Sequence, residues 1–371
     1  MDLPPGFEGK GGKGKVFRLR KSLYGLKQSL RVWFECIGKV VKSHNYCQGQ
    51  AYHTMFYRHT GGDKVAILIV YVDDIILTGD DSNELERLKK ILAKEFEIKD
   101  LGNLKYFLGM EFARSKKGIF VSQRKYVLDL LGEIGFLGCK AAETPNLRLQ
   151  LAKSEEVTNR EQCQRLVGKL LYLSHTRPDI AFATGVVSQF MHSPGSEHFD
   201  VVYRILGYLK GTPGEGLLFG GHENLQVEIY TDVDWAGSVT DRRSTFGSCT
   251  FVGENLVTWR CKKQNVVARS CAEAEFRAAA HGICKVLWIK RLLEELKVTN
   301  SLPMKLYCDN KAAIGIAHNL VLHDRTKHVE VDKHFIKEKI DSGVIYLPYI
   351  STAEQVADIL TKGLPKKQFE N

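Results

Sequence analysis

The run VAILIVYVDDIIL at residues 65–77 places two adjacent carboxylates, Asp73 and Asp74, between two apolar stretches. The apolar stretches predict two short strands that form a hairpin, with the acidic pair at its turn. Taking an unpaired carboxylate out of water costs several kcal/mol of free energy. The two aspartates must therefore lie in a tight exposed turn, or something positive must be there to meet them.

Helical and extended patterns alternate after this hairpin. Asp81 and Glu84 have the spacing of a helix N-cap and its N3 partner, and apolar residues recur at helical spacing over residues 82–98. Residues 104–123 return to strand character around a basic turn, and the apolar spacing over residues 126–224 is mostly helical. The first part of the chain is therefore predicted to be rich in strands, and the part after it to be helical.

The pattern changes near residue 225, where four β-like segments precede a long helix over residues 272–296. The four β-like segments are residues 225–237, 244–252, 255–263 and 265–270. Beyond the long helix the predicted order is strand 304–310, helix 311–319, strand 343–350 and helix 352–364. This order predicts an α/β fold, of the α+β kind, in which a mixed sheet is covered by helices.

The composition is compatible with a nucleic-acid partner and indicates a protein inside a cell. The chain has 53 Lys and Arg residues against 43 Asp and Glu residues, and a basic surface suits a polyanion, although many basic proteins bind none. Nine cysteines without a CxxC pair indicate reduced thiols, as in an intracellular protein of the cytoplasm or the nucleus. No apolar run approaches the length that spans a bilayer, so we expect no membrane partner.

Four acids recur at comparable positions in the last third of the chain. Asp232 ends the first strand, Glu275 lies in the first turns of the long helix, Asp309 ends a later strand, and Asp358 lies on the last helix. Strand ends and helix starts are where an α/β sheet gathers a site. Several carboxylates suit two Mg²⁺ ions, which prefer oxygen ligands. Each acid taken alone could be a solvated helix face or a cap, but their ordered recurrence favours a site.

Five motifs in this last third resemble the ribonuclease H domain of Ty1/copia-type retrotransposon polyproteins. They are YTDVDWAGSVTDRRSTFGSCTF, ARSCAEAEFRA, LYCDNKAAI, RTKHVEVDKHFIKE and ADILTKGLP. Upstream, the motifs that resemble the same family's reverse transcriptase include LPPGFE, RLRKSLYGLKQS, YVDDIILTGDD, DLGNLKYFLGMEF and TRPDIAFA. The resemblance implies a partial reverse-transcriptase palm at residues 1–114, a helical thumb or connection at residues 115–224, and a ribonuclease H-like domain at residues 225–371.

The resemblance assigns roles to the acidic turn and to a segment before it. In reverse transcriptases YxDD is the turn of a palm hairpin, which implies that Asp73 and Asp74 bind the Mg²⁺ that carries the nucleotide, with Tyr71 beneath the primer terminus. SLYGLKQS resembles the segment that contacts the template and the incoming nucleotide. The implied nucleic-acid or nucleotide contacts at this segment and just after it are Lys27, Gln28 and Arg31.

The ribonuclease H resemblance implies a two-ion reaction on an RNA–DNA hybrid. Asp232 would bridge two Mg²⁺ ions, Glu275 and Asp309 would hold one of them, and Asp358 would complete the shell of the other. The RNA strand would be cut to leave a 5′-phosphate and a 3′-hydroxyl, and the partners would be hybrids and primer–template duplexes. Reading of 2′-hydroxyls and hybrid shape would select the RNA strand.

Two other interpretations are weaker. The spaced histidines that invite a zinc hypothesis are His318, His323, His328 and His334. No Cys pair lies at finger spacing, and the matched family motif holds histidines without zinc, although His328 could lie near the scissile phosphate or be structural. The second interpretation is an inactive transposon relic that only binds nucleic acid, because the chain departs from the family's wording at several positions. Phe246 and Cys271, for example, stand where serines are expected.

We expect the purified chain not to synthesise DNA by itself. The family's polymerase uses a third aspartate from a strand upstream of LPPGFE, and a chain that starts at Met1 is expected to lack it together with the fingers. Without that shared ligand the metal ions lose an anchor, and the missing palm and fingers of the polyprotein become a candidate partner. A primer-extension assay with Mg²⁺ and all four nucleotides measures this, and robust synthesis would contradict the expectation.

Overall fold

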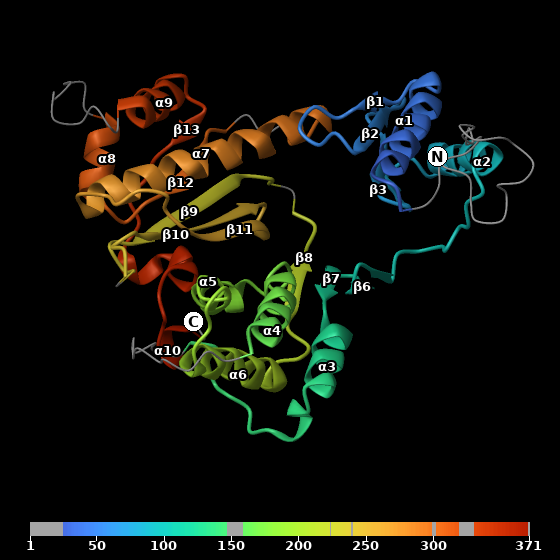
Figure 1. Ribbon diagram of the computed structural model, residues 1–371. Coiled ribbons are helices and arrows are strands. Elements are labelled where there is room, and N and C mark those ends of the chain that lie inside the picture. Colours follow the sequence, from blue (N-terminus) through green and yellow to red (C-terminus); the bar gives the residue numbers. More distant parts are fainter. Residues whose placement is uncertain are drawn as a thin grey trace, which may run out of the picture. The chain divides into compact units, whose positions relative to one another are not determined.

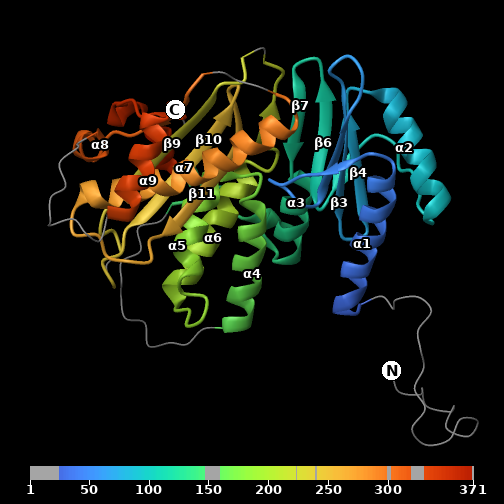
Figure 2. The ribbon, with the colours of Figure 1, turned by 90° about the horizontal axis from the view of Figure 1, so that it is seen from above.

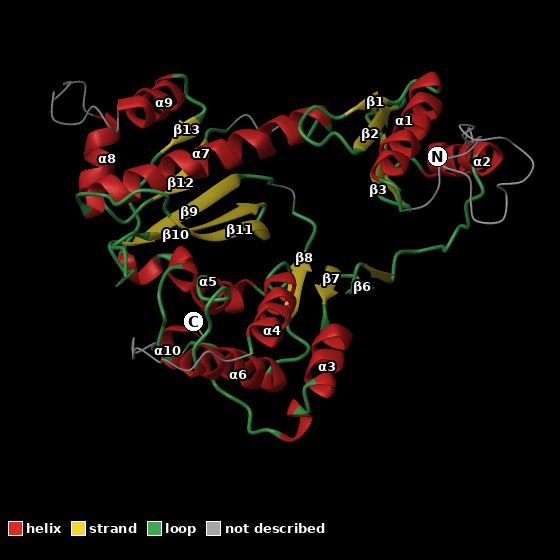
Figure 3. Ribbon diagram, in the orientation of Figure 1, coloured by secondary structure: helices red, strands yellow, loops and turns green. Residues whose placement is uncertain are grey.

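The computed structural model describes residues 25–146, 159–222, 224–238, 240–298, 302–318 and 330–369 (Figure 1). The chain divides into two compact units, the first made of residues 1–101 and 288–299, and the second of residues 102–287 and 300–371. Both units combine strands with helices (Figure 3). The predicted α/β class, with a mixed sheet and helices, is confirmed.

Within the described residues, the first unit contains one antiparallel sheet, two complete helices and the C-terminal end of a longer helix. Its strands, in the order in which they pair, are β1 (Cys47–Gln48), β2 (Met55–His59), β3 (Val65–Tyr71) and β4 (Asp74–Gly79). The complete helices are α1 (Lys27–Ser43) and α2 (Ser82–Glu95). The predicted hairpin and the predicted helix after it are present. Asp81 caps α2 as predicted, because its carboxylate accepts a hydrogen bond from the Glu84 N–H at 3.0 Å.

Strand β3 buries one of its faces against the helices. Ala66, Leu68 and Val70 are at most 3% exposed, whereas the residues between them are partly exposed. These three residues share a core cluster with Ile37 of α1 and Leu88 of α2. Figure 2 shows α1 and α2 beside β3 and β4. A slip of one residue in the strand pairing would turn the apolar set to the other face, so this burial fixes the register of the β3–β4 hairpin.

The second unit begins with a four-stranded antiparallel sheet. Its strands, in pairing order, are β5 (Tyr106–Phe107), β6 (Met110–Ser115), β7 (Gly118–Ser122) and β8 (Gly216–Phe219). The helical interpretation of residues 126–224 is wrong at β8, because this short segment becomes extended through its pairing with the distant β7. The sheet takes strands from both sides of residue 114, where we expect the palm to end. That boundary and the one at residue 224 stay predictions.

The chain between β7 and β8 is helical, as predicted. Its elements are α3 (Arg124–Glu133), η1 (Phe136–Gly138), α4 (Arg160–Leu173), η2 (Pro178–Ile180), α5 (Ala181–Ser188) and α6 (Ser196–Gly211). Their apolar faces meet in one core cluster, in which Leu131, Leu170 and Ile205 are fully buried. Each such side chain contributes about 1.5–3 kcal/mol when it leaves water, so this cluster holds the helices together.

Arg177 joins the segment after α4 to the end of α6. Its guanidinium is 2% exposed and donates hydrogen bonds to both carboxylate oxygens of Asp179. It also donates to the carbonyl oxygen of Thr212 at 2.7 Å and to the Thr212 hydroxyl at 2.8 Å. The Tyr208 hydroxyl donates to Asp179 at 2.7 Å. A buried charge is tolerated here because the planar guanidinium finds acceptors on several sides.

A five-stranded mixed sheet lies in the C-terminal part of the second unit, in the order β11–β10–β9–β12–β13. The strands are β9 (Val227–Asp234), β10 (Thr245–Val252), β11 (Asn255–Lys263), β12 (Met304–Tyr307) and β13 (Ile345–Tyr346). Strands β9, β10 and β11 pair antiparallel, and β12 runs parallel to both β9 and β13. Phe246 of β10 packs with Ala278 of the long helix, whereas Cys249 packs on the other face with Ala181 of α5.

The remaining elements are α7 (Cys271–Glu295), α8 (Lys311–His318), α9 (Glu330–Asp341), η4 (Thr352–Glu354), η5 (Val356–Leu360) and α10 (Lys366–Phe369). Helix α7 has 25 residues and carries charged side chains, among them Arg277 and Lys285, along its length. In the parts of the chain that the structure describes, no helix combines the length and the apolar character needed to cross a membrane.

Two predicted elements of this region are wrong. Residues 265–270 form no strand, because β11 is the edge of the sheet and the chain turns there towards α7; Val266 and Val267 are exposed. The predicted last helix, residues 352–364, is instead two short 3₁₀ helices interrupted at Gln355. Gln355 leaves the helical conformation, and its side chain donates a hydrogen bond to the carbonyl oxygen of Thr231 at 3.0 Å. A contact with the sheet therefore overrides the local helical pattern.

Replacing Arg177 by methionine is expected to destabilise the chain by about 3–5 kcal/mol, since it leaves the partly buried carboxylate of Asp179 without its cation and the Thr212 carbonyl oxygen without its donor. Urea unfolding followed by circular dichroism measures the loss. The matched control is Arg165→Met, which removes an exposed ion pair with Glu133 (3.2 Å) and is expected to cost no more than about 0.5 kcal/mol. Equal losses in the two variants would contradict the role given to Arg177.

Candidate active site

The acidic pair Asp73 and Asp74 lies at an exposed turn of the first unit. Tyr71 pairs with Asp74, so Val72 and Asp73 form a two-residue loop between β3 and β4. Val72 has a φ of +50°, in the left-handed region that favours glycine, and its carbonyl oxygen accepts a hydrogen bond from Trp33 Nε1 at 2.8 Å. Both aspartates are exposed, so neither carboxylate carries the cost of burial. Of the two possibilities for the acidic pair, the exposed turn is the one observed.

The other predicted nucleotide contacts lie on α1 of the same unit. Gln28 and Arg31 are exposed on the first turns of this helix, and the side chain of Lys27 lies outside the described part of the structure. Trp33, on the same helix, holds the acidic turn through its indole N–H. No described hydrogen bond joins Gln28 or Arg31 to the acidic pair. Their contact with nucleic acid therefore stays a prediction.

The four acids of the last third come from four elements around the five-stranded sheet. Asp232 lies on β9, Glu275 in the first turns of α7, Asp309 two residues after the end of β12, and Asp358 in η5. Strands β9 and β12 are parallel neighbours, so their carboxyl ends lie at the same edge of the sheet. Asp358, expected on an α-helix, is instead carried to this edge by a 3₁₀ turn.

Asp232 is 2% exposed and is balanced by two residues that follow η5. The Thr361 hydroxyl donates a hydrogen bond to one oxygen of its carboxylate, and Lys362 Nζ lies 3.3 Å from each oxygen. The same ammonium group lies 2.7 Å from Asp358 Oδ1. Burial raises the pKa of Asp358 to about 6, with the Asp232 charge adding to the rise and Lys362 opposing it. One lysine thus links two of the four acids.

A glycine on β10 lets η5 approach Asp232 this closely. Gly247 is the residue of β10 that pairs with Asp232. A Cβ atom at position 247 would lie 2.7 Å from Leu360 Cβ and 2.8 Å from Thr361 Cγ2. Any side chain here would therefore push the segment that carries Asp358 away from the sheet.

Glu275 is 2% exposed and lies beside two like charges. Its Oε1 accepts a hydrogen bond from the Val233 N–H at 3.2 Å, whereas its Oε2 is buried and has no hydrogen-bond partner among the described residues. Burial, together with the charges of Asp232 and Asp309, raises the pKa of Glu275 to about 9. A carboxylate in this position is stable only when a proton or a cation neutralises it.

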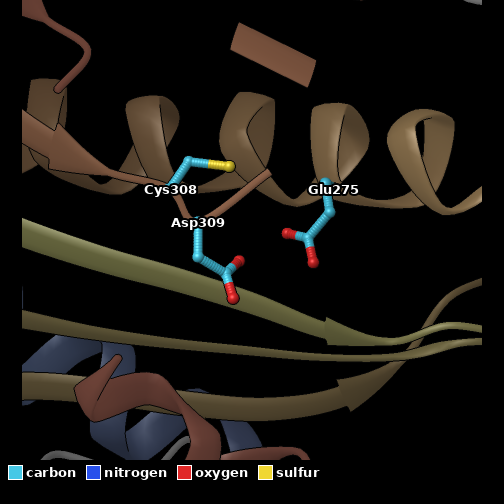
Figure 4. A group of neighbouring side chains, drawn as sticks. All are labelled: Glu275, Cys308 and Asp309. Carbon is cyan, nitrogen blue, oxygen red and sulfur yellow. The ribbon is translucent and has the colours of Figure 1, made fainter. Parts of the chain in front are cut away.

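Asp309 completes the group from the end of β12. The Thr352 hydroxyl donates a hydrogen bond to Asp309 Oδ2 at 2.9 Å. One ligand atom from each of Glu275, Cys308 and Asp309 lies within 4.8 Å of the other two. Figure 4 shows the Glu275 carboxylate reaching from α7 towards the carboxylate of Asp309. The contacts of Glu275 with Val233 and Asp309, and those of Lys362, therefore join all four acids in one cluster.

The donor set of this cluster fits divalent magnesium. Its ligands are carboxylate oxygens, the hard donors that Mg²⁺ prefers. The Oε2 of Glu275 has no hydrogen-bond partner among the described residues, and a carboxylate oxygen of Glu275 lies within 4.8 Å of one of Asp309. Between Asp232 and Asp358 the ammonium group of Lys362 already occupies a position that favours positive charge. The residues present thus fit one cation between Glu275 and Asp309 and a second between Asp232 and Asp358.

Four further side chains lie against the acids and are not predicted from the sequence: Thr352, Thr361, Lys362 and Cys308. Lys362 carries a signal, because it follows Asp358 by four residues inside the ADILTKGLP motif. Cys308 carries none, because neighbours on a strand point to opposite faces and it directly precedes Asp309. The sulfur joins the carboxylates only because the chain turns at the end of β12.

The spaced histidines do not gather around this cluster within the described residues. His318 is exposed at the end of α8, and His334 lies on α9, while His323 and His328 lie outside the described residues. The metal-ligating group of Glu275, Cys308 and Asp309 contains no histidine. A position of His328 near the scissile phosphate therefore stays a prediction.

The sequence of the chain is similar to those of known transposon proteins. Residues 1–148 match the family described as reverse transcriptase (RNA-dependent DNA polymerase). The whole chain is 38% identical to the retrovirus-related Pol polyprotein from transposon RE1 of Arabidopsis thaliana and covers 25% of it. It is also 30% identical to the putative transposon Ty5-1 protein of Saccharomyces cerevisiae, over 76% of this chain and 94% of that protein. The chain thus spans about a quarter of the length of the Arabidopsis polyprotein.

Two solved structures show distant likeness. One is the foamy viral protease–reverse transcriptase in complex with dsDNA, which is 12% identical with a TM-score of 0.45; the match spans 89% of this chain and 60% of the foamy viral chain. The other is LC11-RNase H1 in complex with an RNA/DNA hybrid, which is 13% identical with a TM-score of 0.27; the match spans 37% of this chain and 94% of the LC11-RNase H1 chain. The geometry of the acidic cluster is defined by contacts within this chain and not by these distant likenesses.

Replacing Glu275 by glutamine is expected to raise the melting temperature by several degrees at about pH 8 in the presence of a chelator. A carboxyl group whose pKa rises on folding binds more protons in the folded state, so stability falls as pH increases between its ordinary pKa and about 9. The glutamine variant does not carry this loss, and the difference should shrink towards zero at about pH 5. Thermal unfolding at the two pH values measures it.

Magnesium provides the control for this prediction. When Mg²⁺ replaces the chelator, the unmodified chain should gain stability at the higher pH, since the ion neutralises the carboxylate, and the variant should gain less. A melting-temperature difference that is the same at both pH values would contradict the buried, proton-binding state of Glu275.

Proposed function

The chain belongs to the Pol polyproteins of Ty1/copia-type retrotransposons, and we propose that its second unit cleaves the RNA strand of RNA–DNA hybrids. The observation that carries this proposal is the convergence of Asp232, Glu275, Asp309 and Asp358 from four separate elements. Carboxylates gathered in this way serve magnesium-dependent transfer of phosphoryl groups.

Each acid has a place in the proposed site. Glu275 and Asp309 would hold one magnesium ion, Asp358 would hold a second, and Asp232 would contact both. When bound, two such ions lower the pKa of a water molecule and stabilise the leaving oxygen of an in-line displacement. The hydroxyl group of Thr361 orients the Asp232 carboxylate, and that of Thr352 orients Asp309. These neutral donors hold the ligands in place without adding charge to the site.

Lys362 is the cation of the site when no divalent ion is bound. Its ammonium group holds the Asp232 and Asp358 carboxylates together against their mutual repulsion. The side chain is 36% exposed, so it can swing away from the carboxylates when a divalent ion replaces it. From there its charge would face the phosphate of a bound nucleic acid, which it would help to neutralise.

A group of basic residues on the sheet and on α7 supports a nucleic-acid substrate. Arg260 and Lys262 are exposed on β11, and Lys285 lies nearby on α7. Burial, and then the charges of Arg260 and Lys262, lower the pKa of His281. Cations that crowd one another in this way favour a polyanion, because its phosphates relieve their repulsion.

In the first unit, we propose Asp73 and Asp74 as ligands of the magnesium ion that carries the incoming nucleotide. Their exposure at the tip of a hairpin, fixed by Trp33, supports a role in binding something outside the hairpin. Tyr71 beside them would contact the primer, and Lys27, Gln28 and Arg31 the template or nucleotide. DNA synthesis would be an activity of the longer polyprotein.

Replacing Asp232 by asparagine is expected to lower hybrid cleavage at least a thousandfold, roughly the scale of losing a central electrostatic group. Binding of the hybrid should remain within about threefold, because phosphate contacts from basic residues supply most of the affinity. Asparagine keeps the size of the side chain and can still accept the hydrogen bond of Thr361. Cleavage of a labelled hybrid and filter binding at fixed salt measure the two effects.

The matched control is Asp241→Asn, which removes an exposed ion pair with Lys263 (2.8 Å) and should leave both cleavage and binding unchanged. Undiminished cleavage by Asp232→Asn would remove the site assignment. Binding without any cleavage by the unmodified chain, at several Mg²⁺ concentrations, would instead favour the relic that only binds nucleic acid.

A further inference from the structure

A thiol lies among the carboxylates of the candidate active site. Cys308 is 1% exposed and directly precedes Asp309 at the end of β12. Its sulfur lies within 4.8 Å of a carboxylate oxygen of Glu275 and of Asp309 (Figure 4). The hydrolysis of a phosphodiester by carboxylate-bound magnesium requires no sulfur, so the proposed function leaves this group without a task.

Glu275 supplies an independent sign that a cation binds beside this thiol. The residue is 2% exposed, and its Oε2 has no hydrogen-bond partner among the described residues. The Cys308 sulfur accepts a hydrogen bond from the Asn310 N–H at 3.4 Å, and its thiol donates to the Asn310 carbonyl oxygen at 3.9 Å, so its polar contacts are with neighbouring backbone alone. A buried acceptor oxygen and a nearby thiol are thus both available to the same ion.

The chemistry of sulfur selects which ion this is. Mg²⁺ takes oxygen ligands, whereas Zn²⁺ and the softer Cd²⁺ bind thiolates together with carboxylates. Zinc binds sulfur at about 2.3 Å and oxygen at about 2.0–2.2 Å in a tetrahedral arrangement, so a sulfur and an oxygen on one ion lie about 3.6 Å apart. Ligand atoms within 4.8 Å of one another reach this distance when the side chains approach by at most about 1.2 Å.

We propose that Glu275, Cys308 and Asp309 form a site for a thiophilic divalent cation, Zn²⁺ or Cd²⁺. Cys308 binds as the thiolate: a metal–sulfur bond forms, the sulfur–hydrogen bond breaks, and the proton passes to solvent. The inference deepens the proposed function, because this ion takes the ligands of one magnesium ion and blocks cleavage. Binding of the ion itself does not depend on that function.

A second thiol provides the matched control. Cys271, at the start of α7, accepts a hydrogen bond from Asn310 Nδ2 at 3.4 Å, so the same asparagine contacts both sulfurs. Cys271 is not one of the three residues whose ligand atoms lie within 4.8 Å of one another. Replacing it by serine changes a neighbouring thiol without removing a proposed ligand.

Cadmium titration of the full chain tests the proposal. Exposed thiols are first removed by replacing Cys36, Cys47 and Cys284 with serine. On this background, added Cd²⁺ is expected to produce the ultraviolet charge-transfer band of a cadmium–thiolate bond, at a stoichiometry of one ion per chain. Cys308→Ser should abolish the band and weaken Cd²⁺ binding by at least roughly tenfold, whereas Cys271→Ser should retain both.

Cadmium NMR of the background chain gives a readout that does not depend on the folding of a variant. A resonance in the range of one sulfur and several oxygen ligands supports the site, and a resonance typical of oxygen ligands alone overturns it. A band that persists in Cys308→Ser, or that disappears only in Cys271→Ser, also overturns it.

The effect on catalysis separates this proposal from the proposed function. Micromolar Zn²⁺ should inhibit Mg²⁺-dependent hybrid cleavage by the background chain, and Cys308→Ser should relieve the inhibition. If the cadmium band forms but no hybrid is cleaved at any Mg²⁺ concentration, the ribonuclease function fails and the thiophilic site stands. If the hybrid is cleaved but no band forms, the thiophilic site fails and the ribonuclease function stands.

Discussion

Repulsion among four carboxylates at one edge of a sheet is the constraint on which the C-terminal part of this protein depends. Asp232 and Glu275 are both 2% exposed, so water screens their charges little. Two features offset this repulsion. The Lys362 ammonium group lies between Asp232 and Asp358, and the pKa of Glu275 rises to about 9, which favours a proton on its carboxyl group. Under the proposed function, a divalent cation would replace either one and relieve the remaining repulsion.

Backbone packing decides whether the four acids can meet. The parallel pairing of β9 with β12 places the ends of two strands side by side, and α7 brings Glu275 to the same edge. The fourth acid arrives on η5, which reaches the sheet because Gly247 leaves room for Leu360 and Thr361. The hydrogen bond from Gln355 to β9 fixes this segment. The acidic turn of the first unit has a similar dependence, because Val72 keeps a left-handed conformation that Trp33 holds from α1.

Local sequence patterns predict the secondary structure correctly where the structure of a segment depends on its own residues. The alternation along β3 and the Asp81 cap of α2 predict elements that the structure contains, and ordered motifs predict the family. The predictions are wrong where a contact with a distant segment decides the conformation. Residues 216–219 become a strand by pairing with β7, residues 265–270 have a β-like composition but lie past an edge strand, and Gln355 breaks the last helix to reach Thr231.

The sequence by itself determined the class of the fold and the polyprotein family, and it predicts a site at four acids, because periodicity and ordered motifs are written along the chain. Only the tertiary structure decided which groups surround those acids. Lys362 and Cys308 lie beside carboxylates from distant segments, and Glu275 keeps an oxygen without a hydrogen-bond partner among the described residues. Such distances depend on how the strands and helices pack, and no pattern within a single segment specifies them.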